Sequence, residues 1–160
     1  PIVRGTNYVA PGACLIGSVS LGEESSVFFN SVLRADINSI EIGSHCNIQD
    51  NCTFHVSNTF GVDVGDYVTI GHQVLLHACK IGNNCTVGMG TVVMDGAEVD
   101  DDCVVAAGSL ITKGKYFPPR SLIMGSPAKK VRELTDEEVE ANKQMALKYV
   151  GIKNNYMYHS

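Results

Sequence analysis

Aliphatic residues recur every six positions along most of this chain. Seventeen positions fit four runs of the repeat, and all are apolar, which chance does not supply in a chain that is 44% hydrophobic. They are Val9, Leu15, Leu21, Val27, Leu33, Ile42, Ile48, Phe54, Val64, Ile70, Leu76, Ile81, Val87, Val93, Val99, Val105 and Ile111. A period of six fits neither an α-helix nor an alternating strand, and it predicts a parallel β-helix built from hexapeptide repeats.

The phase of the repeat changes three times. Three residues are inserted after Leu33, four are inserted after Phe54, and one is missing after Leu76. Each change predicts a loop or an altered corner. The residue two before each aliphatic is usually small, and a glycine often follows the aliphatic, as at Gly43 and Gly71. We interpret the small residue as the corner of a narrow prism and the glycine as a backbone free to turn.

The chain is predicted to be a single, mainly β domain with one C-terminal α-helix. The β-helix covers residues 1–112, where the repeat runs. Residues 113–134 contain three of the five prolines and are interpreted as a loop that crosses the surface. Residues 135–160 form the C-terminal helix and tail.

The C-terminal segment has a helix start signal. Thr135 and Glu138 have the spacing of a capping box, in which each side chain bonds the backbone N–H of the other residue. Apolar residues follow on one face, and Gly151 is a plausible stop, so we expect about four helical turns. The helix should pack on the flank of the β-helix or across a subunit boundary.

Charge, hydropathy and cysteine content indicate which partners and which compartment to expect. The net charge is −5, which does not favour nucleic-acid binding. No apolar run is long enough for a transmembrane helix, and the N-terminus lacks a basic-then-apolar signal, so no membrane partner is expected. Four of the six cysteines occupy the small corner position, and no CxxC pair occurs. We interpret them as compact fillers in a reducing, cytoplasmic protein.

Two histidines fall in the same phase of the repeat. His55 follows Phe54 and His77 follows Leu76, and the two histidines are 22 residues apart. Without the four-residue insertion the separation is eighteen, which is one turn of three hexapeptides. His77 should therefore stack on His55 at about 4.8 Å, the spacing of adjacent strands. Arg34 belongs to the same outward column.

His72 belongs to the preceding face of the prism, around a corner from His55 and His77. Gln49 lies on that same face, next to His72. A rigid prism does not easily bring His72 to the other two histidines, whereas two copies side by side can do so. Closed symmetry then suggests a ring, and a three-sided prism favours a homotrimer with three shared sites. Three neutral imidazoles with an open fourth position are typical of catalytic zinc.

The chain resembles the γ-class carbonic anhydrase family, a branch of the hexapeptide-repeat proteins, over about residues 10–132. This resemblance implies a left-handed β-helix, a homotrimer and a metal at each subunit interface: zinc, with iron or cobalt as alternatives. The resemblance rests on motifs in one order: Arg34-x-Asp36, Asn47-Ile48-Gln49-Asp50, His55, Ile70-Gly71-His72, Leu76-His77-Ala78-Cys79, Val87-Gly88-Met89-Gly90 and Gly125-Ser126-Pro127-Ala128-Lys129.

The resemblance also assigns site residues. The metal ligands are His55, His72 and His77, the interface charge network contains Arg34, Asp36 and Asp50, and the polar residues lining the site are Asn47 and Gln49. The implied activity is reversible hydration of carbon dioxide, a small-molecule substrate, by metal-bound hydroxide. Gln49 would orient the hydroxide or the substrate, and Asn47, two residues earlier on the strand, points to the same side.

The chain departs from the family in its acidic residues. The best-known members carry a glutamate after the Arg-x-Asp aspartate and another in the loop after the first ligand. Here the first place holds Ile37, and the loop 56–61 has no acid before Asp63. We therefore expect turnover to be slow or to depend on buffer. Tyr149, Tyr156 and Tyr158 are interpreted as packing residues rather than as substitutes for these glutamates.

Three alternatives remain open. Activated water at the same metal also attacks acyl carbonyls, so thioester hydrolysis is one. A metal-binding trimer that serves assembly rather than catalysis is the second. Hexapeptide acyl transfer is the third, and it leaves the arrangement of three histidines unexplained.

Overall fold

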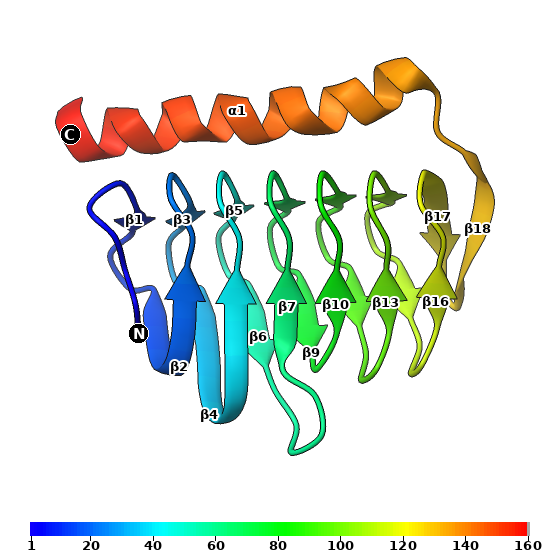
Figure 1. Cartoon of the computed structure of the whole chain (residues 1–160), viewed down its shortest axis with the longest axis horizontal. Coiled ribbons are helices and arrows are strands. Elements are labelled where there is room, and N and C mark those ends of the chain that lie inside the picture. The colour runs from blue at the N-terminus through cyan, green and yellow to red at the C-terminus, as the bar shows by residue number, and fades with distance from the viewer. Residues whose placement is uncertain (160) are drawn as a thin grey trace.

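The computed structural model describes residues 1–159 as a parallel β-helix with one long helix along its side (Figure 1). Short strands stack coil upon coil on three faces of a prism. Face one holds β1 (Tyr8–Val9), β3 (Ser26–Val27), β5 (Asn47–Ile48), β8 (Thr69–Ile70), β11 (Thr86–Val87), β14 (Val104–Val105) and β17 (Ser121–Gly125). The predicted β-helix is confirmed.

Two long strands bend across the other faces. Face two holds the first parts of β2 (Cys14–Leu21) and β4 (Val32–Ile42), then β6 (Thr53–His55), β9 (Leu75–His77), β12 (Val92–Val93) and β15 (Leu110–Ile111). Face three holds their second parts, then β7 (Val62–Val64), β10 (Lys80–Ile81), β13 (Glu98–Val99) and β16 (Tyr116–Phe117).

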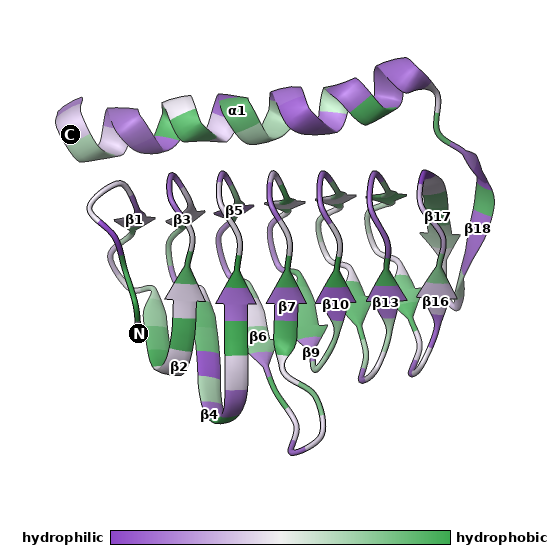
Figure 2. Ribbon diagram, viewed as in Figure 1, coloured by the Kyte–Doolittle hydropathy of each residue, from purple (hydrophilic) through white to green (hydrophobic). Residues whose placement is uncertain are grey.

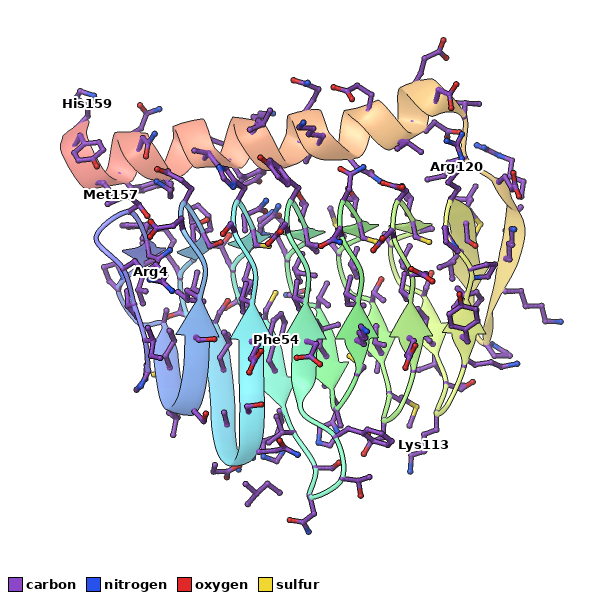
Figure 3. The ribbon with its side chains drawn as sticks, viewed as in Figure 1. Arg4, Phe54, Lys113, Arg120, Met157 and His159 are labelled. Carbon is purple, nitrogen blue, oxygen red and sulfur yellow. The ribbon has the colours of Figure 1, made fainter. Side chains whose placement is uncertain are left out.

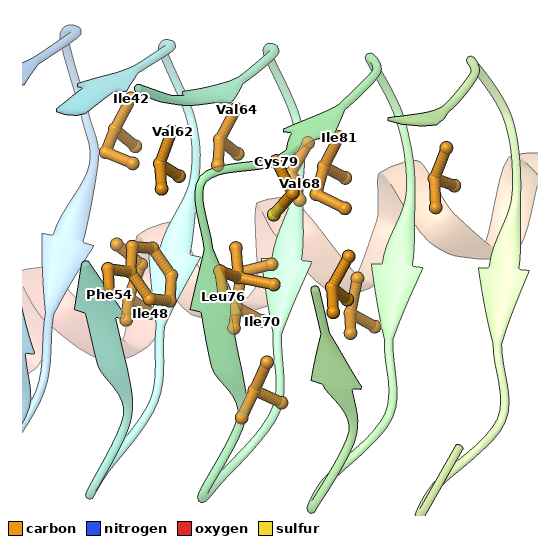
Figure 4. Close-up of a cluster of buried hydrophobic side chains, with 14 of the residues drawn as sticks. Ile42, Ile48, Phe54, Val62, Val64, Val68, Ile70, Leu76, Cys79 and Ile81 are labelled. Atoms are coloured by element: carbon orange, nitrogen blue, oxygen red, sulfur yellow. The ribbon is translucent and has the colours of Figure 1, made fainter. Parts of the chain in front are cut away.

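The six-residue repeat forms the core. Fifteen of the seventeen aliphatic positions are buried, and the other two, Val9 and Leu15, are partly buried and pack against the rest. Figure 4 shows the middle coils, where Phe54, Leu76 and Ile70 lie inside the prism. Burying each such side chain stabilises the fold by about 1.5–3 kcal/mol before entropy is counted.

The glycines after the aliphatics do not make the turns. A Cβ on Gly71 would lie 2.8 Å from the backbone nitrogen of Met89, so the next coil approaches too closely for a side chain. The left-handed conformation occurs two residues after such glycines, for example at His45, Tyr67 and Asn84, with φ of 58°, 57° and 53°. The interpretation of these glycines as turning residues is therefore wrong: they permit close stacking of coils.

The segment 113–134, expected to be a surface loop, is mostly strand. Phe117 and Ile123 follow Ile111 at intervals of six and are buried, so β16 and β17 continue the β-helix. The pair Pro118–Pro119 lies in the turn between them, where a missing N–H is tolerated. β17 then pairs antiparallel with β18 (Ala128–Glu133).

The helix α1 (Asp136–His159) has 24 residues and is longer than predicted. Its capping box is present: Glu138 N–H donates to Thr135 Oγ1 at 3.2 Å, and Thr135 N–H donates to Glu138 Oε1 at 2.9 Å. Gly151 does not end the helix. The helix continues past it despite the cost of about 1 kcal/mol for an internal glycine. Lys153, two residues later, is buried and pairs with Glu24 at 2.7 Å.

α1 runs back along the β-helix and makes several polar contacts with it. Polar residues predominate along it in Figure 2. Asn142 is buried and donates to the carbonyls of Asn84 and Cys103. Arg120, below the first turn of α1 in Figure 3, pairs with Asp136 at 2.8 Å. Within residues 1–159, no helix has the length and apolar character needed to cross a membrane.

All six cysteines, each within the described residues, are free thiols. Burial raises the pKa of Cys46 to about 12 and that of Cys52 to about 11. Such thiols are poor nucleophiles and poor metal ligands, because both roles need the thiolate. The four corner cysteines, Cys46, Cys52, Cys85 and Cys103, are buried, which agrees with the filler role predicted for them, whereas Cys14 is exposed.

Candidate functional site

The predicted histidine column is present on face two. Arg34 of β4 pairs in register with His55 of β6, and His55 pairs with His77 of β9. The two imidazoles are partly buried, and His55 Nδ1 lies 3.1 Å from His77 Nε2. Counting hexapeptides without the insertions therefore gave the correct register across three coils.

A carboxylate holds the outer nitrogen of each ring. His55 Nε2 lies 2.9 Å from Asp36 Oδ1, and His77 Nδ1 lies 2.7 Å from Asp95 Oδ1. Asp36 also pairs with Arg34 at 2.5 Å. The hydrogen bond from His55, followed by that from Arg34, lowers the pKa of Asp36, so this carboxylate is ionised and accepts both bonds.

These contacts assign the tautomers. A neutral ring that donates its outer N–H to a carboxylate presents a lone pair at its inner nitrogen. The inner lone pairs of His55 and His77 then face each other at 3.1 Å, an arrangement that either a shared proton or a metal cation stabilises. Ligand histidines with a carboxylate on the far nitrogen are typical of metal sites, so these residues fit a divalent metal.

His72 lies around the corner, after β8 on face one. Its Nδ1 pairs with Asp50 Oδ2 at 3.0 Å. Within residues 1–159, no group of three or more histidine, cysteine or acidic side chains is placed to hold a metal. One chain thus brings His55 and His77 together and keeps His72 apart, as the phase of the repeat predicts.

The polar residues next to His72 form a buried network. Gln49 Nε2 donates to Asn47 Oδ1 at 3.0 Å, and Asn47 Nδ2 donates to Thr69 Oγ1 at 2.9 Å. Gln49 and Asn47 are buried, so their amides are fixed in orientation. Asp50 contacts His72 rather than Arg34, and the ion pair formed inside one chain is Arg34–Asp36.

Asp95 is not among the site residues predicted from the sequence. It follows His77 by eighteen residues, one full coil, and this spacing was the available signal. Among the tyrosines, Tyr149 packs edge-on against Phe28 with ring centroids 5.8 Å apart, and Tyr156 stacks on Tyr8 at 5.4 Å. These contacts agree with the packing role predicted for both, whereas Tyr158 is 67% exposed and does not have that role.

Comparisons with known proteins agree with this geometry. Residues 78–113 match the family model described as bacterial transferase hexapeptide (six repeats). A carbonic anhydrase of Geobacillus kaustophilus is 39% identical over 150 residues, which cover 94% of this chain and 82% of that protein. The mitochondrial gamma carbonic anhydrase 2 of Arabidopsis thaliana is 40% identical over 95% of this chain, and the match spans only 57% of the plant protein.

A solved structure shares the whole architecture. The hexapeptide transferase family protein from Anaplasma phagocytophilum superposes with a TM-score of 0.94 at 41% identity, covering 98% of this chain and 92% of that one. Its description names transferases, whereas the relatives above are named carbonic anhydrases. Identity of about 40% over nearly the whole chain places the protein in the γ-class carbonic anhydrase family of hexapeptide-repeat proteins.

Proposed function

We propose that this protein is a metal-dependent carbonic anhydrase that interconverts carbon dioxide and bicarbonate. The observation that carries the proposal is the pair of imidazoles on face two. Their inner nitrogens converge to 3.1 Å, and Asp36 and Asp95 occupy their outer nitrogens. Membership of the γ-class family adds support, because proteins named carbonic anhydrases occur among its relatives.

The third ligand in this proposal is His72 of a second copy. His72 lies on a different face from His55 and His77, so a neighbouring chain supplies it most simply. An apolar stripe lies beside the histidine column, and it supports the proposal that a second copy covers face two. Val32, Thr53, Leu75, Val92 and Leu110 follow one another in register on successive coils, and all of them except Thr53 are apolar. A closed ring of three copies forms three equivalent sites.

The proposed metal is zinc, with ferrous iron or cobalt as alternatives. A divalent metal held by neutral imidazoles keeps its full charge and lowers the pKa of a coordinated water to about 7. Asp36 and Asp95 fix the tautomers of His55 and His77. Gln49 and Asn47 present buried amides that orient a small neutral substrate beside His72.

Proton transfer from the metal-bound water to solvent is the slow step in the proposed reaction. Val56, directly after His55, is buried, and the loop that follows carries Phe60, half-exposed, rather than an acid. Asp36 is engaged with Arg34 and His55, so it serves as a hydrogen-bond acceptor rather than as a mobile base. We therefore expect a rate that rises with buffer concentration.

Stopped-flow hydration of carbon dioxide tests the proposal. The protein is purified without oxygen and assayed with zinc and with ferrous iron, beside a His77→Ala variant. Metal-dependent activity that this variant loses supports the proposal. A fully metallated trimer without activity contradicts it. The name of the Anaplasma structure, which says transferase, raises group transfer as a second candidate. For the acyl class, transfer from acetyl coenzyme A that survives metal removal would establish that reaction instead.

The cellular compartment is also a proposal. Six free thiols, five of them buried, suit a reducing environment such as the cytoplasm. The plant relative is named as mitochondrial. Fractionation of cells that express the tagged protein tests this point.

A further inference from the structure

Within residues 1–159, face three of the β-helix is covered neither by α1 nor by the interface of the proposed trimer. α1 packs on strands of face one, namely β1, β5 and β8. The proposed interface uses face two and the corner between faces one and two, where His72 lies. In a three-sided prism, face three is opposite that corner, so it is free in a single chain and in a trimer alike. Its strands β7, β10, β13 and β16 face the viewer in Figure 1.

A groove of about 630 Å³ lies along this face. Its floor contains Gly43, Gly65 and Gly82, which directly follow inward aliphatic residues and have no side chain to fill the space. One wall is a column of outward residues that follow one another in register on successive coils, and they are Ser20, Glu41, Asp63, Lys80 and Glu98.

This wall holds carboxylates that have no cationic partner. Glu41 pairs in register with Asp63. Lys80 lies on the next coil, between Asp63 and Glu98. Adjacent strands are about 4.8 Å apart, and like charges directly opposite each other in a sheet are destabilising. Within residues 1–159, none of these four side chains belongs to an ion pair of 4.0 Å or less. A cationic partner would therefore relieve a repulsion that the β-helix maintains.

Two more carboxylates close the C-terminal end of the groove. Asp100 accepts a hydrogen bond from the Tyr116 hydroxyl at 2.7 Å, and this bond is the main cause that lowers the pKa of Asp100. Asp101 accepts from the backbone N–H of Asn83 at 2.7 Å. The groove thus contains five carboxylates and one ammonium group, that of Lys80, so its potential favours a cationic occupant.

The arrangement of these charges favours a basic peptide over a metal ion or a polyamine. Within residues 1–159, no group of three histidine, cysteine or acidic side chains is placed to hold a metal. Lys80 repels a polyamine, whereas a peptide offers this ammonium group a backbone carbonyl. The wall from Glu41 to Glu98 extends over three coil spacings, about 14 Å, which is the length of about four residues of an extended chain.

The basic segment of a second copy is a poor occupant for this groove. Residues 113–132 contain six basic residues and no acid. Three of the six already pair with carboxylates of their own chain, and they are Arg120, Lys130 and Arg132. A contact between this segment and face three is also heterologous, so it would produce open chains of trimers rather than a closed assembly. The better occupant is a segment of another protein.

We propose that face three docks an extended, basic segment of a partner protein. Cationic side chains of the segment pair with Glu41 and Glu98, and a backbone carbonyl accepts from Lys80. Alternate side chains of an extended chain point the same way, about 7 Å apart, so the segment carries lysine or arginine at every second position. The contact involves none of the histidines, so it is independent of the proposed metal site and of carbonic anhydrase activity.

Fluorescence anisotropy on the whole chain tests this inference. The probe is a labelled six-residue peptide of alternating arginine and glycine, and spermidine, which has the same charge, is the competitor. We expect saturable binding that weakens at least about tenfold when the salt concentration rises from about 50 to about 500 mM. Spermidine should displace the peptide only at a concentration at least about tenfold higher than that of unlabelled peptide.

Two double variants of equal charge separate the groove from the net charge of the protein. Glu41→Gln with Glu98→Gln should weaken peptide binding at least about tenfold. Glu137→Gln with Glu140→Gln removes the same charge from exposed positions of α1 and should change the affinity less than about twofold. Thermal melting checks the fold of both. If the first double variant is destabilised, Glu98→Gln alone replaces it.

Three outcomes would overturn the inference. The first is a peptide that shows no saturable binding, and the second is an equal loss of affinity in the two double variants, which would mean that net charge alone attracts the peptide. The third is displacement by spermidine as readily as by unlabelled peptide, which would mean that the groove does not select a peptide. Each outcome can be interpreted whether or not the protein hydrates carbon dioxide.

Discussion

His55 Nδ1 and His77 Nε2 face each other across adjacent coils at 3.1 Å. The β-helix enforces this distance, because the strands that carry the two histidines pair in register and their inward neighbours, Phe54 and Leu76, are fully buried. Neither ring can turn away without losing its carboxylate partner. The rigid solenoid thus holds two nitrogen donors in place, and in the proposed metal site the third donor comes from a second copy.

Replacing His72 with alanine should empty the metal site while the chain stays folded. His72 is partly exposed and contributes nothing to the apolar core, so its loss removes a ligand without a cavity. We expect metal content, measured by mass spectrometry, to fall to background, with a melting temperature close to that of the parent protein. His159→Ala, at the end of α1, is the matched control. Unchanged metal content in His72→Ala would rule out His72 as a ligand.

Mixed trimers test whether two chains share the site. His72→Ala and His55→Ala chains should each be inactive alone. When they are unfolded together, refolded and purified through two different tags, some interfaces combine an intact His55–His77 pair with an intact His72. Those interfaces should regain activity. No activity in trimers proven to contain both chains would contradict ligation by two subunits.

The carboxylate of Asp95 should tune metal affinity. It fixes the His77 tautomer through a bond of 2.7 Å, and loss of such a partner typically weakens metal binding about 10–100-fold. Competition with a chromophoric chelator measures the affinity of Asp95→Asn directly. Asp63→Asn removes the same charge from an exposed position of β7 and serves as the control. Equal affinity for Asp95→Asn and the parent would show that Asp95 does not act on the metal.

Much of the fold could be predicted because one period governs the core. The exception, residues 113–134, has a physical reason. Phe117 and Ile123 keep the six-residue spacing, but prolines and glycines around them have the composition of a loop. In the structure Pro118 and Pro119 occupy a turn, where they leave the strand ladder intact. Composition competed with periodicity there, and periodicity was the better guide.

The part of the site that depends on strand register could be predicted from the sequence, and the rest could not. The register of Arg34, His55 and His77 follows from counting coils, whereas the contact between Asp95 and His77 depends on side-chain rotamers that no spacing specifies. The reach of α1 was underestimated because Gly151 is a common stop signal. Beyond Gly151 the helix contacts the β-helix through the distant pair Lys153–Glu24, which a local pattern does not reveal.

Truncation of the two adjacent leucines on β9 should lower stability by very different amounts. Leu76 is fully buried, and Leu76→Ala should lower the free energy of unfolding by about 2–5 kcal/mol through the cavity it leaves. Leu75 points outward and is 37% exposed within one chain, so Leu75→Ala should cost far less in core stability. Denaturant unfolding of both variants, at a concentration that holds the oligomeric state constant, makes the comparison. A similar loss in both would contradict the inward and outward assignment.

The N-terminus of α1 should lose stability at acidic pH through Glu138. Hydrogen bonds from Arg132 and from the Thr135 N–H lower the pKa of Glu138 to about 2, from an ordinary value of 4.5. A group whose pKa is lower in the folded state stabilises that state above its unfolded pKa and loses this effect as the pH falls. The contribution of Glu138 is therefore complete above about pH 4.5 and disappears toward pH 2.

Glu138→Gln tests this window because the amide resembles the protonated acid. We expect the variant to have a lower melting temperature than the parent at pH 7, and this difference to decrease between pH 4.5 and 2. Added salt should also reduce the difference at pH 7, because the pair is exposed. Glu137→Gln removes the same charge from the same helical turn without touching Arg132, and it accounts for the helix dipole. A gap for Glu138→Gln that stays constant across the window, or one matched by Glu137→Gln at every pH, would show that the Arg132–Glu138 pair does not anchor the start of the helix.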